Sequence, residues 1–88
     1  MFGNFNTATG AFALFSDTGS GANTATGYNA LFDNTTGTEN TATGIHALEN
    51  NTIGMLNTAT GTDALAGNGA GNNNTAAGGF ALDRKSVV

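Results

Sequence analysis

The stretch Asn23-Thr24-Ala25-Thr26-Gly27-Tyr28-Asn29-Ala30-Leu31 decides the fold of this chain, because it recurs. The pattern Asn-Thr-Ala-Thr-Gly-x-x-Ala-Leu begins at Asn6, Asn23, Asn40 and Asn57, and a slightly altered copy begins at Asn74. Successive copies start 17 residues apart, with no insertion or deletion. A period this regular indicates a repeat architecture in which each unit packs against its neighbours in the sequence.

The repeat length selects the kind of solenoid. A unit of 17 residues is too short for two helices and two turns, and Thr, Asn and Gly are poor residues for a helix interior. We therefore predict an all-β fold, a parallel β-solenoid (β-roll) of about five coils in which equivalent residues stack about 4.8 Å apart. The period leaves its handedness open. The predicted divisions are an N-terminal cap at 1–5, coils at 6–22, 23–39, 40–56 and 57–73, and a C-terminal capping coil at 74–88.

The pattern within one unit predicts where its side chains lie. In an extended Thr-Ala-Thr segment the two Thr side chains lie on one face and the Ala on the other. The following glycine, such as Gly10, is predicted at a turn where φ is positive or where a neighbouring backbone leaves no room for a side chain. Ala13-Leu14 and its equivalents are predicted to begin a second short strand. The leucines are predicted to form one apolar core ladder: Leu14, Leu31, Leu48, Leu65 and Leu82.

The composition predicts a thin core. Thr, Ala, Gly and Asn contribute 15, 15, 14 and 13 of the 88 residues, whereas Leu, Ile, Val and Phe together contribute 16. Ladders of Asn and Thr can add hydrogen bonds between coils, but little apolar surface is available to offset the entropy of ordering the chain. The chain has no Cys and therefore no disulfides. Oligomerisation is the simplest remaining source of stability, so we predict a homo-oligomer.

The charge balance excludes two classes of partner. The net charge is −4, with only 2 basic residues, so no positive surface exists for nucleic acid or for an anionic membrane. The apolar runs are too short to cross a bilayer, and the N-terminus lacks the features of a signal peptide. Any export signal or anchor is therefore expected outside this chain.

The repeat also resembles a known family. Thr24-Ala25-Thr26-Gly27-x-x-Ala30 resembles the Val-Ala-Ile-Gly-x-x-Ser/Ala coil of trimeric autotransporter adhesin heads, and the longer stretch from Asn23 to Gly37 resembles repeats of bacterial surface and phage tail-fibre proteins. The resemblance spans about residues 3–83. It implies a homotrimeric β-roll that serves as an adhesive head or shaft segment of a fibre. It also implies an extracellular place on a cell surface or virion, and a host-surface glycan or protein as ligand.

Residues that could carry chemistry have no repeated partners. His46 stands where other copies have Phe, Asn or Asp, and we interpret it as an ordinary exposed variant. No base is repeated beside any serine. The aspartates occupy three different repeat positions, so solvated turn residues are favoured over metal ligands: Asp17, Asp33, Asp63 and Asp83. The sequence therefore predicts no enzyme, no catalytic residue, no metal site and no cofactor. Tyr28 could touch a glycan, but its repeat position varies too much to predict a repeated site.

The threonines leave a choice open. Their ladder consists of Thr7, Thr9, Thr24, Thr26, Thr41, Thr43, Thr58 and Thr60. If these side chains face solvent, they form a regular two-column array of methyls and hydroxyls that resembles the Thr-x-Thr face of β-solenoid ice-binding (antifreeze) proteins. The matching adhesin positions are aliphatic and buried, so the family resemblance favours Thr side chains that pack inward or against a partner chain. The sequence does not choose between core, interface and solvent.

The two ends are predicted to differ from the middle. Asp83-Arg84-Lys85 places both basic residues of the chain on the last coil, which is typical of a protective cap. At the other end, Met1, Phe2 and Phe5 either cover the first coil or dock on another molecule, and covering is favoured.

Overall fold

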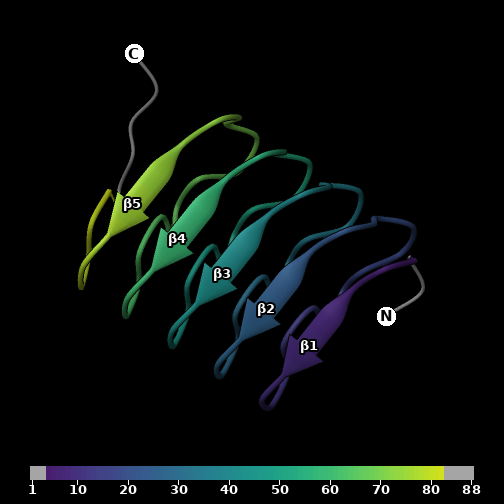
Figure 1. Cartoon of the computed structure of the whole chain (residues 1–88), viewed down its shortest axis with the longest axis horizontal. Coiled ribbons are helices and arrows are strands. Elements are labelled where there is room, and N and C mark those ends of the chain that lie inside the picture. The colour runs from purple at the N-terminus through teal and green to yellow at the C-terminus, as the bar shows by residue number, and fades with distance from the viewer. Residues whose placement is uncertain (1–3, 83–88) are drawn as a thin grey trace.

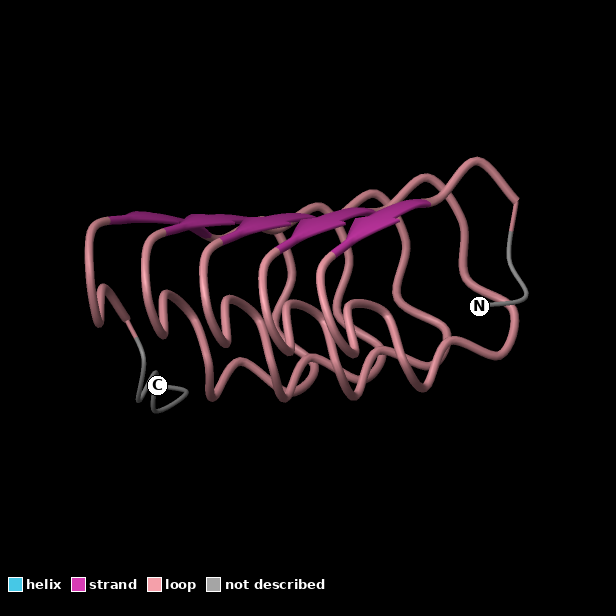
Figure 2. Cartoon of the chain, turned by 90° about the horizontal axis from the view of Figure 1, so that it is seen from below, coloured by secondary structure: helices cyan, strands magenta, loops and turns pink. Residues whose placement is uncertain are grey.

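The computed structural model describes residues 4–82, which form an all-β parallel solenoid of about four turns. Five three-residue strands form one sheet in the order β1-β2-β3-β4-β5. They point the same way (Figure 1) and lie in one flat layer along one side of the coil stack (Figure 2). The predicted fold class is confirmed. The strands are β1 (Thr7–Thr9), β2 (Thr24–Thr26), β3 (Thr41–Thr43), β4 (Thr58–Thr60) and β5 (Thr75–Ala77).

The strands pair residue by residue at the repeat distance. Thr24 pairs with Thr41, Ala25 with Ala42 and Thr26 with Thr43, and the other three strand pairs follow the same register. Each coil thus lies on the next without a shift. Coils are numbered here in chain order, from coil 1 (6–22) to coil 5, which is described from 74 to 82.

A narrow column of leucine and alanine forms the core. Leu14, Leu31, Leu48 and Leu65 are fully buried, and the alanines that pack with them are Ala25, Ala30, Ala42, Ala47, Ala59, Ala64 and Ala76. The predicted ladder is therefore correct for four of its five leucines. Leu82 is 50% exposed, because coil 5 is the last coil among the described residues and no further leucine covers it.

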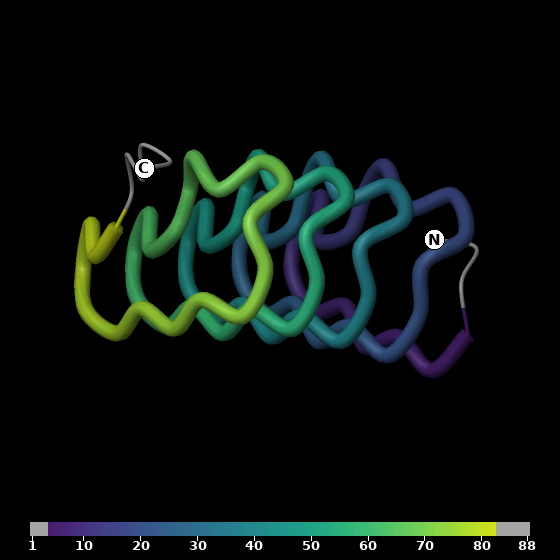
Figure 3. The backbone as a smooth tube through the Cα atoms, turned by 90° about the horizontal axis from the view of Figure 1, so that it is seen from above, coloured from purple at the N-terminus to yellow at the C-terminus, as the bar shows by residue number. Residues whose placement is uncertain are grey.

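The predicted second strand at Ala13-Leu14 and its equivalents is wrong. Leu14 has φ 53° and Phe12, two residues earlier, has φ 63°, both in the left-handed region rather than extended. The positive φ values place turns here instead of a strand, and the backbone tube winds from one coil to the next (Figure 3). The Leu14 N–H still donates to the Ala30 carbonyl at 3.0 Å, so coils remain linked here without a strand. Left-handed φ costs a non-glycine residue about 1–2 kcal/mol, which burial of the leucine side chain offsets.

The glycine after each strand is required by both conformation and space. Gly27 and Gly44 have φ 128°, and a Cβ placed on Gly27 would lie 2.6 Å from the Gly44 carbonyl oxygen. No L side chain fits there without moving the next coil. The predicted role of this position is confirmed.

The first asparagine of each repeat forms a ladder through the stack. The backbone N–H of Asn40 donates to Asn23 Oδ1 at 2.9 Å, and the N–H of Asn57 donates to Asn40 Oδ1 at 3.0 Å. Asn40 Nδ2 also donates to the Gly54 carbonyl at 2.8 Å. Both asparagines and Asn23 are fully buried. Each asparagine therefore links its coil to the two beside it, through its backbone N–H on one side and its side-chain oxygen on the other.

A second buried asparagine ladder lies eleven residues after the first in each repeat, at Asn34, Asn51 and Asn68. Asn51 Nδ2 donates to Asn34 Oδ1 at 2.9 Å and to the Gly54 carbonyl at 3.1 Å, and Asn68 Nδ2 donates to Asn51 Oδ1 at 2.9 Å. In coil 1 this position is Asp17, which accepts a hydrogen bond from the Ser20 N–H at 3.2 Å. The prediction that Asp17 is a solvated turn residue is wrong, because its side chain is 1% exposed and closes the turn from inside.

Of the side chains predicted to cover the two ends of the stack, Phe5 lies within the described range. Phe5 is 91% exposed, so it does not cover coil 1 as favoured. Met1, Phe2 and the predicted cap at Asp83, Arg84 and Lys85 lie outside the described residues.

Replacing Asn40 by Ala should destabilise the fold by about 1–3 kcal/mol, because it leaves the buried Asn57 N–H without a partner and removes one of the two donors to the Gly54 carbonyl. Urea unfolding followed by circular dichroism measures the loss. Asn50→Ala is the matched control, because Asn50 is exposed and its loss should cost less than about 0.5 kcal/mol. Equal effects of the two substitutions would contradict a stabilising ladder.

Candidate functional site

The outer side of the strands forms a regular surface. We call it the threonine face and define it as Thr7, Thr9, Thr24, Thr26, Thr41, Thr43, Thr58 and Thr60, all of which are exposed. The alanine between each pair lies on the opposite side of the strand, and it is fully buried in β2, β3 and β4. Inward packing of these threonines, one of the options left open by the sequence, is therefore wrong. In β2, β3 and β4 this alanine packs in the core, so it cannot contact a partner chain.

The threonine face is a regular, uncharged array. Its rungs follow the strand spacing of about 4.8 Å, and the two Thr of one rung are two residues apart along the strand, roughly 6.6–6.8 Å. Parallel pairing in register keeps each column straight. Every side chain presents one methyl and one hydroxyl, with no group that titrates near neutral pH. The face is thus suited to contact with another regular surface.

An exposed aromatic cluster lies on coils 1 and 2, beyond the glycine turn. Phe15 stacks on Phe32 with ring centroids 5.2 Å apart, and Phe12 meets Phe15 and Tyr28 edge to face at 5.5 and 6.0 Å. Phe12, Phe15 and Tyr28 are 49%, 59% and 46% exposed. Sequence reasoning missed this cluster, although Phe15 and Phe32 stand one repeat apart. Aromatic rings held together at the surface are typical of binding sites.

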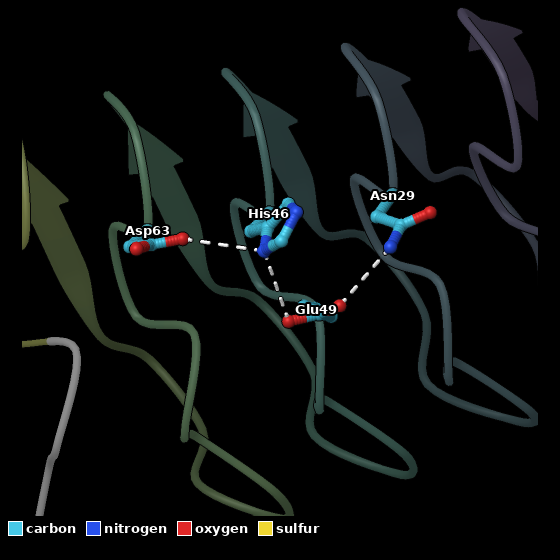
Figure 4. A network of polar contacts seen from close by, with 4 residues as sticks. All are labelled: Asn29, His46, Glu49 and Asp63. Carbon is cyan, nitrogen blue, oxygen red and sulfur yellow. Dashed lines mark hydrogen bonds and ion pairs between the residues drawn. The ribbon is translucent and has the colours of Figure 1, made fainter.

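A polar network continues along the same side of the stack (Figure 4). His46 Nδ1 lies 3.4 Å from Glu49 Oε1 and 3.5 Å from Asp63 Oδ1, and Asn29 Nδ2 donates to Glu49 Oε2 at 3.2 Å. His46 is 35% exposed in its side chain, so it is half-buried rather than an ordinary exposed variant. Such partly exposed pairs contribute little to stability, about 0–1 kcal/mol. Asn29, His46 and Asp63 occupy the same repeat position, but the residue type there changes from copy to copy, so sequence reasoning missed the network.

A shallow cleft of about 490 Å³ lies near the N-terminal end of the stack. Its lining includes Phe5, Ser20, Gly21, Ala22, Thr38 and Glu39. Ser20 is buried, and its Oγ accepts a hydrogen bond from Asn23 Nδ2 at 2.9 Å, so the hydroxyl belongs to the asparagine ladder. The cleft brings together one carboxylate and no basic group.

The remaining candidate chemistry is sparse. Among residues 4–82, no three His, Cys, Asp or Glu side chains are grouped in a way that could hold a metal ion. Asp33 and Asp63 are partly buried, and Asp83 and Ser86 lie outside the described part of the chain. The same part contains no helix long and apolar enough to span a membrane.

Comparison of the chain with protein-family models, with curated proteins and with solved structures finds no match to any of them.

The orientation of the strands can be tested at one rung. Ala42→Val adds two methyl groups to a fully buried position and should cost about 1–3 kcal/mol of stability. Thr41→Val keeps the side-chain shape at an exposed position and should change stability by less than about 0.5 kcal/mol. Thermal unfolding of both variants measures the difference. The reverse order of costs would mean that the threonines face inward.

Proposed function

We propose that this chain is a non-catalytic structural and adhesive repeat module, a head or shaft segment of a fibre on a bacterial surface or phage tail, and that it works as an extracellular homotrimer. The observation that carries the proposal is the threonine face, an uncharged surface that follows the flat layer of strands along coils 1 to 4. It is consistent with the resemblance to adhesin head repeats.

A thin core supports association. Coils 2, 3 and 4 each bury one leucine and two alanines, and coil 1 buries only its leucine, while many larger apolar side chains stay at the surface of a single chain. Ile45, Ile53 and Leu56 are 50%, 55% and 50% exposed, in addition to the aromatic cluster. A single chain thus has little buried apolar surface, and association of copies would stabilise its folded state by mass action.

The threonine face is the surface that we assign to the contact between copies. Short side chains let two flat sheets approach closely, and no charge has to be desolvated. Each buried hydroxyl can pair with a hydroxyl of the neighbouring copy, because a Thr hydroxyl both donates and accepts. Packing against a partner chain was one of the options left open by the sequence.

Adhesion is assigned to the aromatic cluster and the polar network beside it. The aromatic cluster offers ring faces, and the network of Asn29, His46, Glu49 and Asp63 beside it offers hydrogen-bonding groups. A glycan or protein ligand can use both, because such sites combine apolar rings with a few polar groups. Tyr28 joins the two, with its ring 5.7 Å from that of His46.

The trimer predicts a definite mass in dilute solution. At the lowest working concentrations, light-scattering chromatography should give three times the chain mass of 8.7 kDa. Thr41→Lys at the middle rung should shift the mass to that of one chain, because a buried unpaired charge costs several kcal/mol. Asn50→Lys, on an exposed turn outside the threonine face, should leave the trimer intact. A monomer in the unmodified protein would contradict the trimer.

Ice binding is the second candidate, favoured by the exposure of all eight threonines in two straight columns. A rigid, regular array of methyls and hydroxyls can order water in the same repeat. This role requires the face to be free, so it competes directly with the trimer.

Ice binding predicts thermal hysteresis and altered ice-crystal shape in a solution of the monomer. Thr41→Lys should abolish both, because a long charged side chain interrupts the flat array, whereas Asn50→Lys should keep them. Unchanged freezing behaviour of a folded monomer would exclude this second candidate.

A further inference from the structure

The interface between neighbouring coils occurs four times within the chain and uses the same groups each time. At the last junction Thr58 and Leu65 donate their N–H groups to the carbonyls of Asn74 and Ala81, at 2.8 and 2.9 Å. In return, Gly78 donates to the Thr60 carbonyl at 2.8 Å. Every coil thus has one set of groups on its N-terminal side and the complementary set on its C-terminal side.

The two ends of the stack expose the unpaired halves of this interface. On coil 5, the N–H groups of Thr75 and Leu82 hold the positions that Thr58 and Leu65 hold on coil 4, and they have no partner among residues 4–82. On coil 1, the carbonyls of Asn6 and Ala13 hold the positions that Asn74 and Ala81 hold on coil 5, and they also lack a partner in this range. Donors on one end therefore match acceptors on the other.

Side chains at both ends fit the same arrangement. Leu82 is 50% exposed and Ala8 is exposed, whereas their equivalents inside the stack are fully buried. A Cβ on Gly61 would lie 2.6 Å from the carbonyl of Gly78, but the space beyond Gly78 is open among the described residues. The C-terminal end is thus shaped to receive one more coil.

We propose that the chain stacks end to end, with coil 1 of a second copy seated on coil 5 of the first. The contact would continue the interface already present at four junctions, with Leu14 of the second copy covering Leu82. Because it joins two different surfaces and repeats a translation, it is a heterologous contact that extends without closing. Stacking is independent of sideways trimer formation through the threonine face.

Thr75→Pro tests the stacking contact at its edge. Proline removes only an N–H that points away from coil 4, and proline is accepted in edge strands. Thr75→Val is the matched control, since it keeps the N–H and removes the hydroxyl.

Sedimentation velocity over a concentration series reads out the assembly, and circular dichroism confirms that each variant is folded. The unmodified chain and Thr75→Val should give a mass that grows with concentration without a plateau, whereas Thr75→Pro should need at least roughly tenfold more protein to associate. Added to the unmodified chain, Thr75→Pro should shorten the stacks, because its coil 1 still binds and its coil 5 cannot extend.

Three results would overturn the proposal. One is a mass for the unmodified chain that stays at one chain or stops at three chains as concentration rises, and a stop at three would leave the proposed trimer standing. Another is equal association of Thr75→Pro and Thr75→Val. The third is association that appears only after residues 83–88 are removed, which would mean that the chain covers its own end.

Discussion

The structure depends on a hydrogen bond from the backbone of one coil to an asparagine side chain of the coil before it. It occurs at all four junctions, from the N–H of Asn23, Asn40, Asn57 and Asn74, at 2.9 to 3.0 Å. A buried amide left unpaired is costly, so a coil shifted by even one residue would lose this bond together with those of its neighbours. The ladder therefore fixes the register of the coils, a role that a large apolar core has in most domains.

The outer surface inherits its regularity from that constraint. Because each coil repeats the register of the last, the threonine columns are straight and the threonine face stays flat over its full length. Where the sequence varies between repeats, the surface varies too, which is why the aromatic cluster is confined to coils 1 and 2. The invariant positions fix the shape, and the variable positions distinguish one part of the stack from another.

Much of the fold could be predicted from the period alone, but which side of each strand lies inside the solenoid could not. Alternation places Thr24 and Ala25 on opposite sides of a strand, yet it does not say which side is inside. The narrow interior admits Ala25 and not Thr24. Leu31 was correctly assigned to the core but not to a left-handed turn, because its φ of 53° follows from the tight path of the coil. Asp17 was expected to be solvated, but it closes a turn from inside its own coil, and the buried Asn51 pairs with an asparagine one coil away.

The functional surfaces were harder to predict than the core for a related reason. The threonine face is repeated and was visible in the sequence as a candidate, whereas the contacts of His46 with Glu49 and Asp63 depend on residue types that change from one copy to the next. The contact of His46 with Asp63 joins coils 3 and 4, so it forms only once these coils are stacked. The stacking also separates two surfaces with different chemistry, one uniform and uncharged, the other aromatic and polar.

All four coil junctions use the same hydrogen bonds, and this limits how such a chain can change in evolution. Gain or loss of one whole repeat leaves every asparagine, glycine and leucine opposite its equivalent, so the rod changes length by a single step of about 4.8 Å. Gain or loss of one residue inside a repeat instead misplaces all the ladders at once. The chain is therefore expected to change in length by whole repeats. Selection can then adjust the number of coils while the fold stays the same.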